Sequence, residues 1–98
     1  MNFAFRIVTA ATTANANDRV IGVDTTSAPV TVTLPSASSV RSGFILTIKD
    51  TAGNCVTNNI TVSRGAGDTI DAAANVTLNA KYAAISLVSN GSNAWHVY

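Results

Sequence analysis

Four residues of the sequence could carry acid–base or metal chemistry if the fold brought them together. Asp68 and Asp71 lie three positions apart in the stretch GDTIDAAANVTL, and the chain has one cysteine, Cys55, and one histidine, His96. Two carboxylates can act as general acid and base around a water molecule or a sugar. A metal site would need further His, Cys, Asp or Glu ligands at suitable spacing.

The surroundings of these residues favour turns and packing over chemistry. The chain contains no Glu, His96 is distant in sequence, and the aspartate spacing is not that of a calcium loop. Asp68 and Asp71 are therefore predicted to form turns by accepting hydrogen bonds from nearby backbone N–H groups. Cys55 can form neither an intrachain disulfide nor a cysteine zinc site, and we expect a half-buried thiol near a turn. The sequence predicts no enzymatic activity, metal or cofactor.

The C-terminal stretch Trp95-His96-Val97-Tyr98 allows two interpretations. As a strand, it directs Trp95 and Val97 to one face and His96 and Tyr98 to the other. In the first interpretation Trp95 packs in the core and His96 is partly exposed. In the second, His96 and Tyr98 belong to a surface that recognises sugars by stacking.

Composition favours an all-β protein that associates with copies of itself. Thr, Val and Ile are plentiful, whereas Glu and Gln are absent and Met occurs once. Much of the 47% hydrophobic fraction is alanine, so the core is thin and association would stabilise it. The net charge is +1 without a basic cluster, which argues against nucleic acid as a partner. No segment is long enough to span a membrane.

Short alternating segments predict the strands, and turn residues separate them. The Asn90-Gly91 pair suits a hairpin turn with positive φ, so 83–89 and 94–98 are expected to pair antiparallel. The phrases VTVTL, NITVS and NVTL are similar, but too short to establish a repeat. Helical turns are considered only at DAAAN and in the SASSVRSG loop. The expected strands are 3–9, 19–24, 30–34, 43–50, 59–63, 75–79, 83–89 and 94–98, with 69–70 as a brief bridge.

This arrangement predicts a small antiparallel β-sandwich or barrel-like roll, assembling as a homotrimer. Residues 18–98 are expected to form the single β domain, and residues 1–17 an N-terminal strand with a flexible arm. Such an arm can add a strand to a neighbouring sheet, with Phe3, Phe5 and Ile7 as anchors. The alternative is that this strand folds into its own domain.

The order of several phrases resembles a module of bacteriophage tail-fibre and tailspike proteins. TLPSASS, GFILTIKDTAGN, NNITVSRGAGDTIDAAANVTLN and YAAISLVSNGSNAWHVY follow one another over roughly residues 20 to 98. The resemblance implies a trimeric, β-rich module on the virion surface without catalysis. Ala72 departs from the pattern, which usually has Gly after DTID, so the turn there is expected to differ.

Two functions from this resemblance remain open. The first is a small trimeric decoration, or cement, protein on a phage capsid, bound to the major capsid protein or another virion protein; its standalone length favours this. The second is a tail-fibre or tailspike tip whose loops bind a host surface glycan. A polysaccharide hydrolase is a third class, which the absence of Glu and the isolated His96 weigh against.

Overall fold

Two β-sheets form the framework of the protein. The structure, a computed structural model, describes residues 4–98; the predicted anchor Phe3 lies outside this range. The large sheet has the order β1 (Ala4–Val8), β3 (Asp18–Val23), β5 (Ile45–Asp50), β9 (Ala84–Ser89), β10 (Ala94–Val97) and β7 (Thr69–Ile70). The small sheet has the order β2 (Thr12–Thr13), β4 (Val30–Thr33), β6 (Ile60–Ser63) and β8 (Asn75–Leu78).

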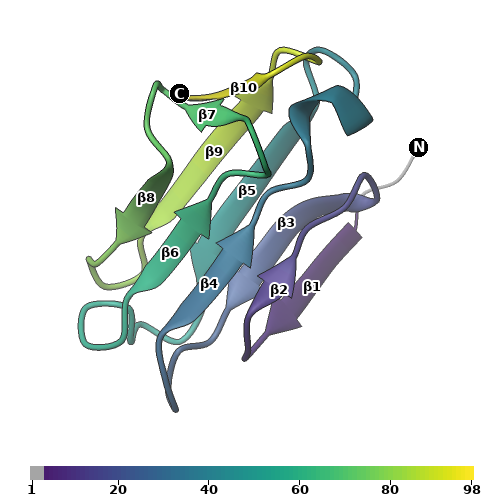
Figure 1. Ribbon diagram of the computed structural model, residues 1–98. Helices are drawn as coiled ribbons and strands as arrows, with labels where there is room; N and C mark the ends of the chain where they lie inside the picture. Colours follow the sequence, from purple (N-terminus) through teal and green to yellow (C-terminus); the bar gives the residue numbers. More distant parts are fainter. Residues whose placement is uncertain (1–3) are drawn as a thin grey trace.

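The first six strands alternate between the two sheets (Figure 1). We call a strand of the large sheet plus the following strand of the small sheet a coil. Three coils, β1–β2, β3–β4 and β5–β6, stack side by side, so strands of successive coils pair parallel. Antiparallel strands follow at the far end of this stack: β8 pairs with β6, and β9 pairs with β5 and β10.

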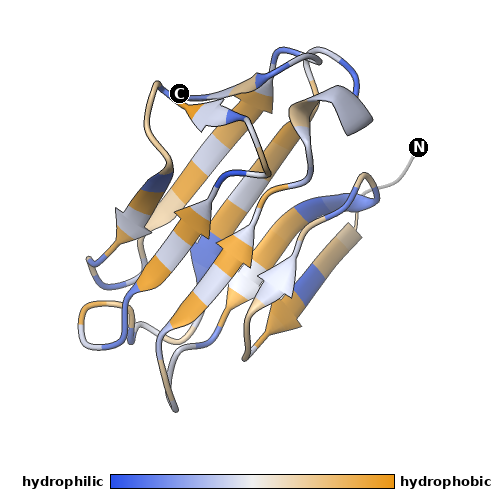
Figure 2. Ribbon diagram, in the orientation of Figure 1, coloured by the Kyte–Doolittle hydropathy of each residue, from blue (hydrophilic) through white to orange (hydrophobic). Residues whose placement is uncertain are grey.

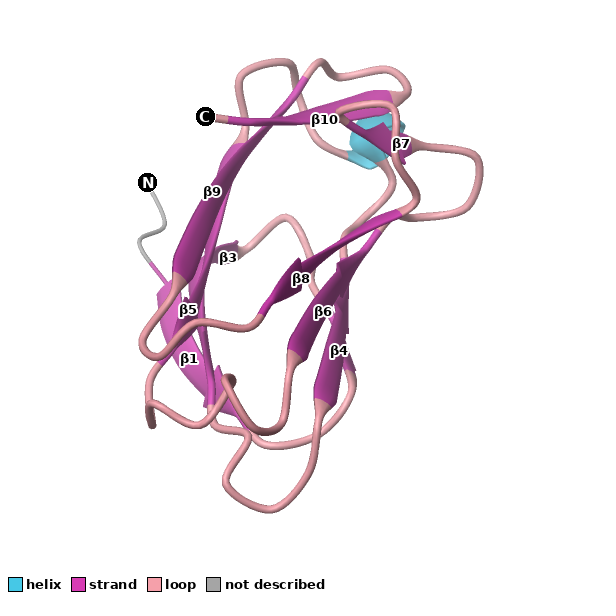
Figure 3. Cartoon of the chain, turned by 90° about the vertical axis from the view of Figure 1, so that its left-hand side faces the viewer, coloured by secondary structure: helices cyan, strands magenta, loops and turns pink. Residues whose placement is uncertain are grey.

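The buried side chains lie between the two sheets, which face each other as two layers in the side view of Figure 3. Apolar and polar bands alternate along β4 and β6 in Figure 2, as expected for strands with one buried face. Trp95 is fully buried, and its Nε1 donates to the Pro35 carbonyl at 3.3 Å. Its ring packs edge-to-face with the Phe44 ring, with 6.2 Å between the ring centroids. This ring pair fills the end of the core beneath β10.

The coarse fold prediction is confirmed, because the described chain is strand-rich and nearly helix-free. The antiparallel part of the prediction is wrong. The pairs β1–β3, β3–β5, β2–β4, β4–β6 and β7–β10 are all parallel, so both sheets are mixed. For the first four of these pairs the cause is the coil connection: the neighbouring strand comes one full coil later, where the chain runs in the same direction again.

The N-terminal segment pairs within this same domain, which is the second of the two alternatives. Residues 4–8 form β1 on β3, and Thr12–Thr13 form β2 on β4, so sheet pairing continues across the expected boundary at residues 17 and 18. The polar segment TAATTANAND, which has no strand period, contains β2. The strand is only two residues long, so it leaves no periodic signal.

The three similar phrases form neighbouring strands of the small sheet, with NVTL antiparallel to the other two. Val30 pairs with Ile60 and Ile60 with Leu78, while Val32 pairs with Val62 and Val62 with Val76. The predicted pairing of the two C-terminal strands is confirmed, with His96 opposite Val88.

The one helical segment of residues 4–98 is the single 3₁₀ turn Ala37–Ser39 in the SASSVRSG loop, whereas DAAAN forms a tight turn. No helix in this part of the chain has the length and apolar character needed to cross a bilayer.

Candidate functional site

The two aspartates of GDTIDAAANVTL do not form a carboxylate pair. Asp68 is buried, and its Oδ2 accepts a hydrogen bond from the backbone N–H of Ala37 at 2.7 Å. Asp71 is exposed, and its carboxylate lies 3.3 Å from His96 Nδ1 and 3.4 Å from the Val97 N–H. Each carboxylate therefore bonds to a different part of the chain, which is the arrangement of two structural residues and not of an acid–base pair.

Asp71 and Ala72 form a strained two-residue turn. Their φ angles are +46° and +68°, and Ile70 and Ala73 exchange two backbone hydrogen bonds of 2.8 Å across the turn. Positive φ at both central residues is the arrangement of type I′ turns, which favour Asp-Gly or Asn-Gly. Asp71 matches this preference, whereas Ala72 carries a Cβ where glycine would be unstrained.

The Asn90–Gly91 loop is closed by a side chain as well as by glycine. Gly91 has φ +77°, as predicted, but Asn90 does not adopt a positive φ. Instead Asn90 Oδ1 accepts hydrogen bonds from the N–H groups of Ser92, Asn93 and Ala94 at 2.9 to 3.1 Å. The loop between β9 and β10 therefore uses the Asn90 side chain as a hydrogen-bond acceptor, and does not depend on a positive φ at Asn90.

Asp50, rather than the predicted turn residues, organises the loops at one end of the molecule. Its buried carboxylate accepts hydrogen bonds from the N–H groups of Gly53, Cys55 and Tyr82. Burial opposes its ionisation, but these bonds outweigh burial and hold the pKa of Asp50 below its ordinary value.

Cys55 is fully buried, not half-buried as expected, and its thiol donates to the Ala80 carbonyl at 2.9 Å. Burial and the neighbouring Asp50 carboxylate raise the pKa of the Cys55 thiol, which makes it a poor nucleophile. Within residues 4–98, no three His, Cys, Asp or Glu residues lie together as metal ligands.

The outer face of the large sheet gathers the remaining predicted site residues. Its side chains lie in three cross-strand rows, which together define this face throughout. The rows are Ile7–Gly22–Lys49–Ala84, Phe5–Val20–Thr47–Ser86–Tyr98 and Ile45–Val88–His96. The predicted arm residues Phe5 and Ile7 and the predicted recognition residues His96 and Tyr98 are therefore parts of one surface.

This face is apolar and exposed at the same time. Phe5, Ile7 and Tyr98 are 58%, 57% and 68% exposed, and Ile45 is 42% exposed. Lys49 is the one lysine or arginine in the three rows. Its ammonium donates to the Tyr82 carbonyl and lies 5.5 Å from the centre of the Tyr82 ring. An apolar partner could therefore cover much of this face without burying an unpaired lysine or arginine charge.

The outer face of the small sheet has the opposite character. Its two rows are Thr13–Thr33–Ser63–Asn75 and Thr31–Thr61–Thr77, all short, uncharged polar side chains. Such side chains suit a sheet face that stays in contact with water. The two outer surfaces therefore differ, and only that of the large sheet has the composition of a contact surface.

Sequence reasoning missed Ile45 and Val88 as members of the apolar face. A signal was present in the stretch FILTI, where apolar residues occur on both faces of the strand. Phe44, Leu46 and Ile48 fill the buried face, so Ile45 has no core position left. An apolar residue at an outward position of an alternating strand indicates a second contact surface.

No protein-family model matches the chain, and no curated protein is similar to it at a significant level.

Proposed function

We propose that this protein is a non-enzymatic structural protein of a bacteriophage virion, acting as a small trimeric decoration protein on the capsid surface. The observation that carries the structural role is the exposed apolar outer face of the large sheet. A surface of this kind is typical of proteins that bury it against a partner. The assignment to a phage particle rests on the resemblance of residues 20 to 98 to tail-fibre and tailspike modules.

The partner on this face is a second copy of the chain. The two sheets are two layers with one polar outer surface and one apolar outer surface. Three copies related by a three-fold axis would place the apolar surfaces inside and the Thr-rich surfaces outside. Phe5, Ile7 and Ile45 would then be buried, which compensates for a small core.

The mass of the protein in solution tests the assembly. We expect sedimentation at micromolar concentration to give the mass of a trimer for the wild-type protein. Ile45→Lys places a charge on the outer face of the large sheet and should release folded monomers. Val56→Lys is the matched control, because Val56 is 58% exposed but lies in the 51–59 loop. A monomeric wild-type protein, or equal effects of the two variants, would contradict the proposal.

The location of the protein on purified phage particles tests the virion assignment. Labelled antibody and electron microscopy should place it over the capsid. Its absence from purified particles would reject the phage role while leaving the assembly result intact.

Tail-fibre tip binding to a host glycan is the second candidate. The exposed aromatic ring of Tyr98, beside His96, favours it, because aromatic rings stack on sugars. In this case the antibody label would lie on the tail, and the purified protein would compete with phage for adsorption. Tyr98→Ala should abolish that competition.

A further inference from the structure

The N-terminal end of the coil stack consists of two edge strands. β1 is the edge of the large sheet and β2 the edge of the small sheet, and neither has a second neighbour among residues 4–98. Both edges lie on the same side of the molecule, at the lower right in Figure 1. Edge strands present unpaired backbone N–H and C=O groups, which can pair with strands of other molecules.

Arg6 lies on the inner side of this edge, at a position that belongs to the core in every other strand of its row. It pairs in register with Ile21, which pairs with Ile48 and then Ile85, and these three isoleucines are buried. In this row the interior of the stack is thus apolar in the second and third coils and carries a charge in the first. A polar terminal repeat is typical of the ends of stacked-repeat proteins.

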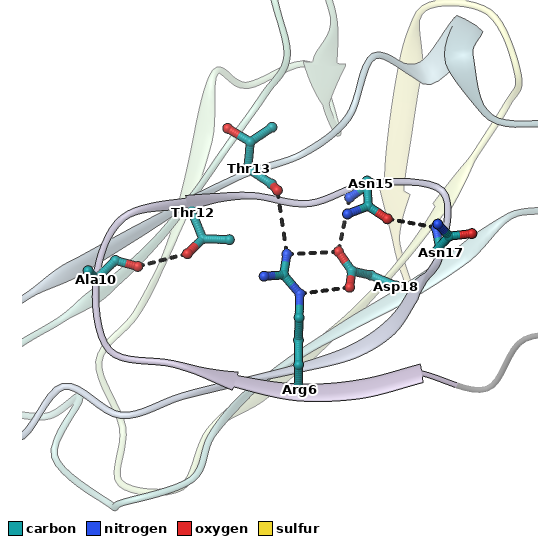
Figure 4. A network of polar contacts seen from close by, with 7 residues as sticks. All are labelled: Arg6, Ala10, Thr12, Thr13, Asn15, Asn17 and Asp18. Atoms are coloured by element: carbon teal, nitrogen blue, oxygen red, sulfur yellow. Dashed lines mark hydrogen bonds and ion pairs between the residues drawn. The ribbon is translucent and has the colours of Figure 1, made fainter.

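The Arg6 side chain spans the opening between the two sheets. Its Nε and Nη2 donate to the Asp18 carboxylate at 2.8 and 3.0 Å, and Nη2 is 3.5 Å from the Thr13 carbonyl on β2 (Figure 4). The Asn15 N–H donates to the same carboxylate at 3.0 Å. The guanidinium therefore connects β1, the 13–18 segment and the start of β3 across the end of the core.

The exposure of the pair is uneven. The Asp18 side chain is 4% exposed, whereas that of Arg6 is 40% exposed and remains hydrated. A strand added beside β1 would cover Arg6 and remove this water, at the cost of burying a charge. Inward-pointing charges and very short strands are two means by which proteins block edge-to-edge pairing, and this end has both in Arg6 and β2.

We propose that the Arg6–Asp18 ion pair is an end cap that prevents the β1 edge of one copy from pairing antiparallel with the β1 edge of a second copy. A two-fold axis between two such edges makes the contact self-complementary. It also places two Arg6 side chains close together on the inner side, where the like charges repel each other. Without the pair, the outward Phe5 and Ile7 and an apolar inner side leave β1 as a strand suited to pairing.

Removal of both charges tests the cap. Arg6→Val with Asp18→Asn removes the charges together, so that no buried carboxylate is left without its partner, and asparagine retains an acceptor for the Asn15 N–H. We expect the mass of this variant in sedimentation velocity to be twice that of the wild-type protein under the same conditions. Amide hydrogen exchange of residues 4–8 should slow in the variant as the edge becomes paired.

Arg41→Val is the control, because Arg41 is exposed and lies in the loop before β5, outside both edge strands. It loses the same charge and gains the same side chain, and it should keep the wild-type mass. A folded double variant with the wild-type mass overturns the proposal, as does equal association of the control. If the valine variant does not fold, Arg6→Gln with Asp18→Asn removes both charges while keeping amide hydrogen bonds, and the same two outcomes apply. Each comparison is relative to wild type, so the result is independent of the proposed trimer.

Discussion

Replacing Ala72 with glycine should stabilise the protein, although the change removes a methyl group and adds freedom to the unfolded chain. Ala72 has φ +68° in a turn whose two 2.8 Å hydrogen bonds fix the backbone. A non-glycine residue in this left-handed region costs about 1–2 kcal/mol. The greater entropy of glycine in the unfolded chain offsets about 0.4–1 kcal/mol of the relief. The net gain in free energy of unfolding should be about 0.5–1 kcal/mol.

The neighbouring Ala73 supplies the control. Ala73 is exposed like Ala72 but does not have a positive φ, so Ala73→Gly relieves no strain. This variant should lose about 0.5–1 kcal/mol through the entropy of the unfolded chain. Two Ala→Gly changes at adjacent positions are thus expected to have opposite signs.

Thermal unfolding at one fixed protein concentration measures both variants, because association makes Tm concentration-dependent. In a domain of this size, a change of 1 kcal/mol in the free energy of unfolding shifts Tm by about 4–8 °C. Ala72→Gly should therefore raise Tm by about 2–8 °C, and Ala73→Gly should lower it by a similar amount. Urea denaturation should show the same order with an unchanged m value. If Ala72→Gly destabilises as much as Ala73→Gly, the turn is not strained and the reasoning is refuted.

Three further variants test other parts of the structure. Thr25→Val should stabilise the protein by about 1 kcal/mol in chemical denaturation, because Thr25 Oγ1 is buried and has no hydrogen-bond partner among residues 4–98. A loss of stability would show that the hydroxyl has a partner. Gly53→Ala should cost more stability than Gly67→Ala in the same assay, although both glycines have positive φ. A Cβ at Gly53 would lie 2.7 Å from the Tyr82 ring, whereas a Cβ at Gly67 would have no atom of the described residues within 4 Å. Equal losses would count against the contact. Burial opposes ionisation of Asp18, but the hydrogen bonds from Arg6 and the Asn15 N–H outweigh burial and lower the pKa of Asp18. The stability that the ionised carboxylate contributes is therefore complete above the unfolded pKa of about 3.9, and it is lost as pH falls through the folded pKa. Asp18→Asn should therefore cost about 1 kcal/mol at neutral pH and nothing at strongly acid pH, and a loss of the same size at both would show that the charge is not the cause.

The sequence predicted most strands but not their neighbours. Alternation in VTVT or FILTIK identifies a strand with one buried face, yet it contains no information on which strand lies beside it. The coil arrangement depends on where each connection crosses between the sheets, and no local pattern records that. Only the C-terminal pair could be derived, because the loop at Asn90-Gly91 joins strands that are adjacent in the chain.

The inner side of β1 shows a different limit. In FAFRIV, period-two alternation separates Phe5 and Ile7 from Arg6, and side-chain polarity alone would place the two apolar residues inside. The structure places Arg6 inside because Asp18, twelve residues later, supplies its partner. Likewise Asp68 binds the N–H of Ala37, thirty-one residues away, rather than its own turn alone. Contacts of this range follow from the assembled fold and not from spacing.

The alternation of β1 to β6 between the two sheets also affects how the chain folds during synthesis. Within residues 4–98, β9 and β10 are the only neighbours in a sheet that are also consecutive strands in sequence. In every other pair, at least one intervening strand must leave the ribosome before the second partner does. Non-local pairings slow folding, because the entropy of loop closure is lost before the stabilising contacts form. We therefore expect nascent chains to remain sensitive to protease until β9 emerges and joins β5, after which protection should appear in a single step.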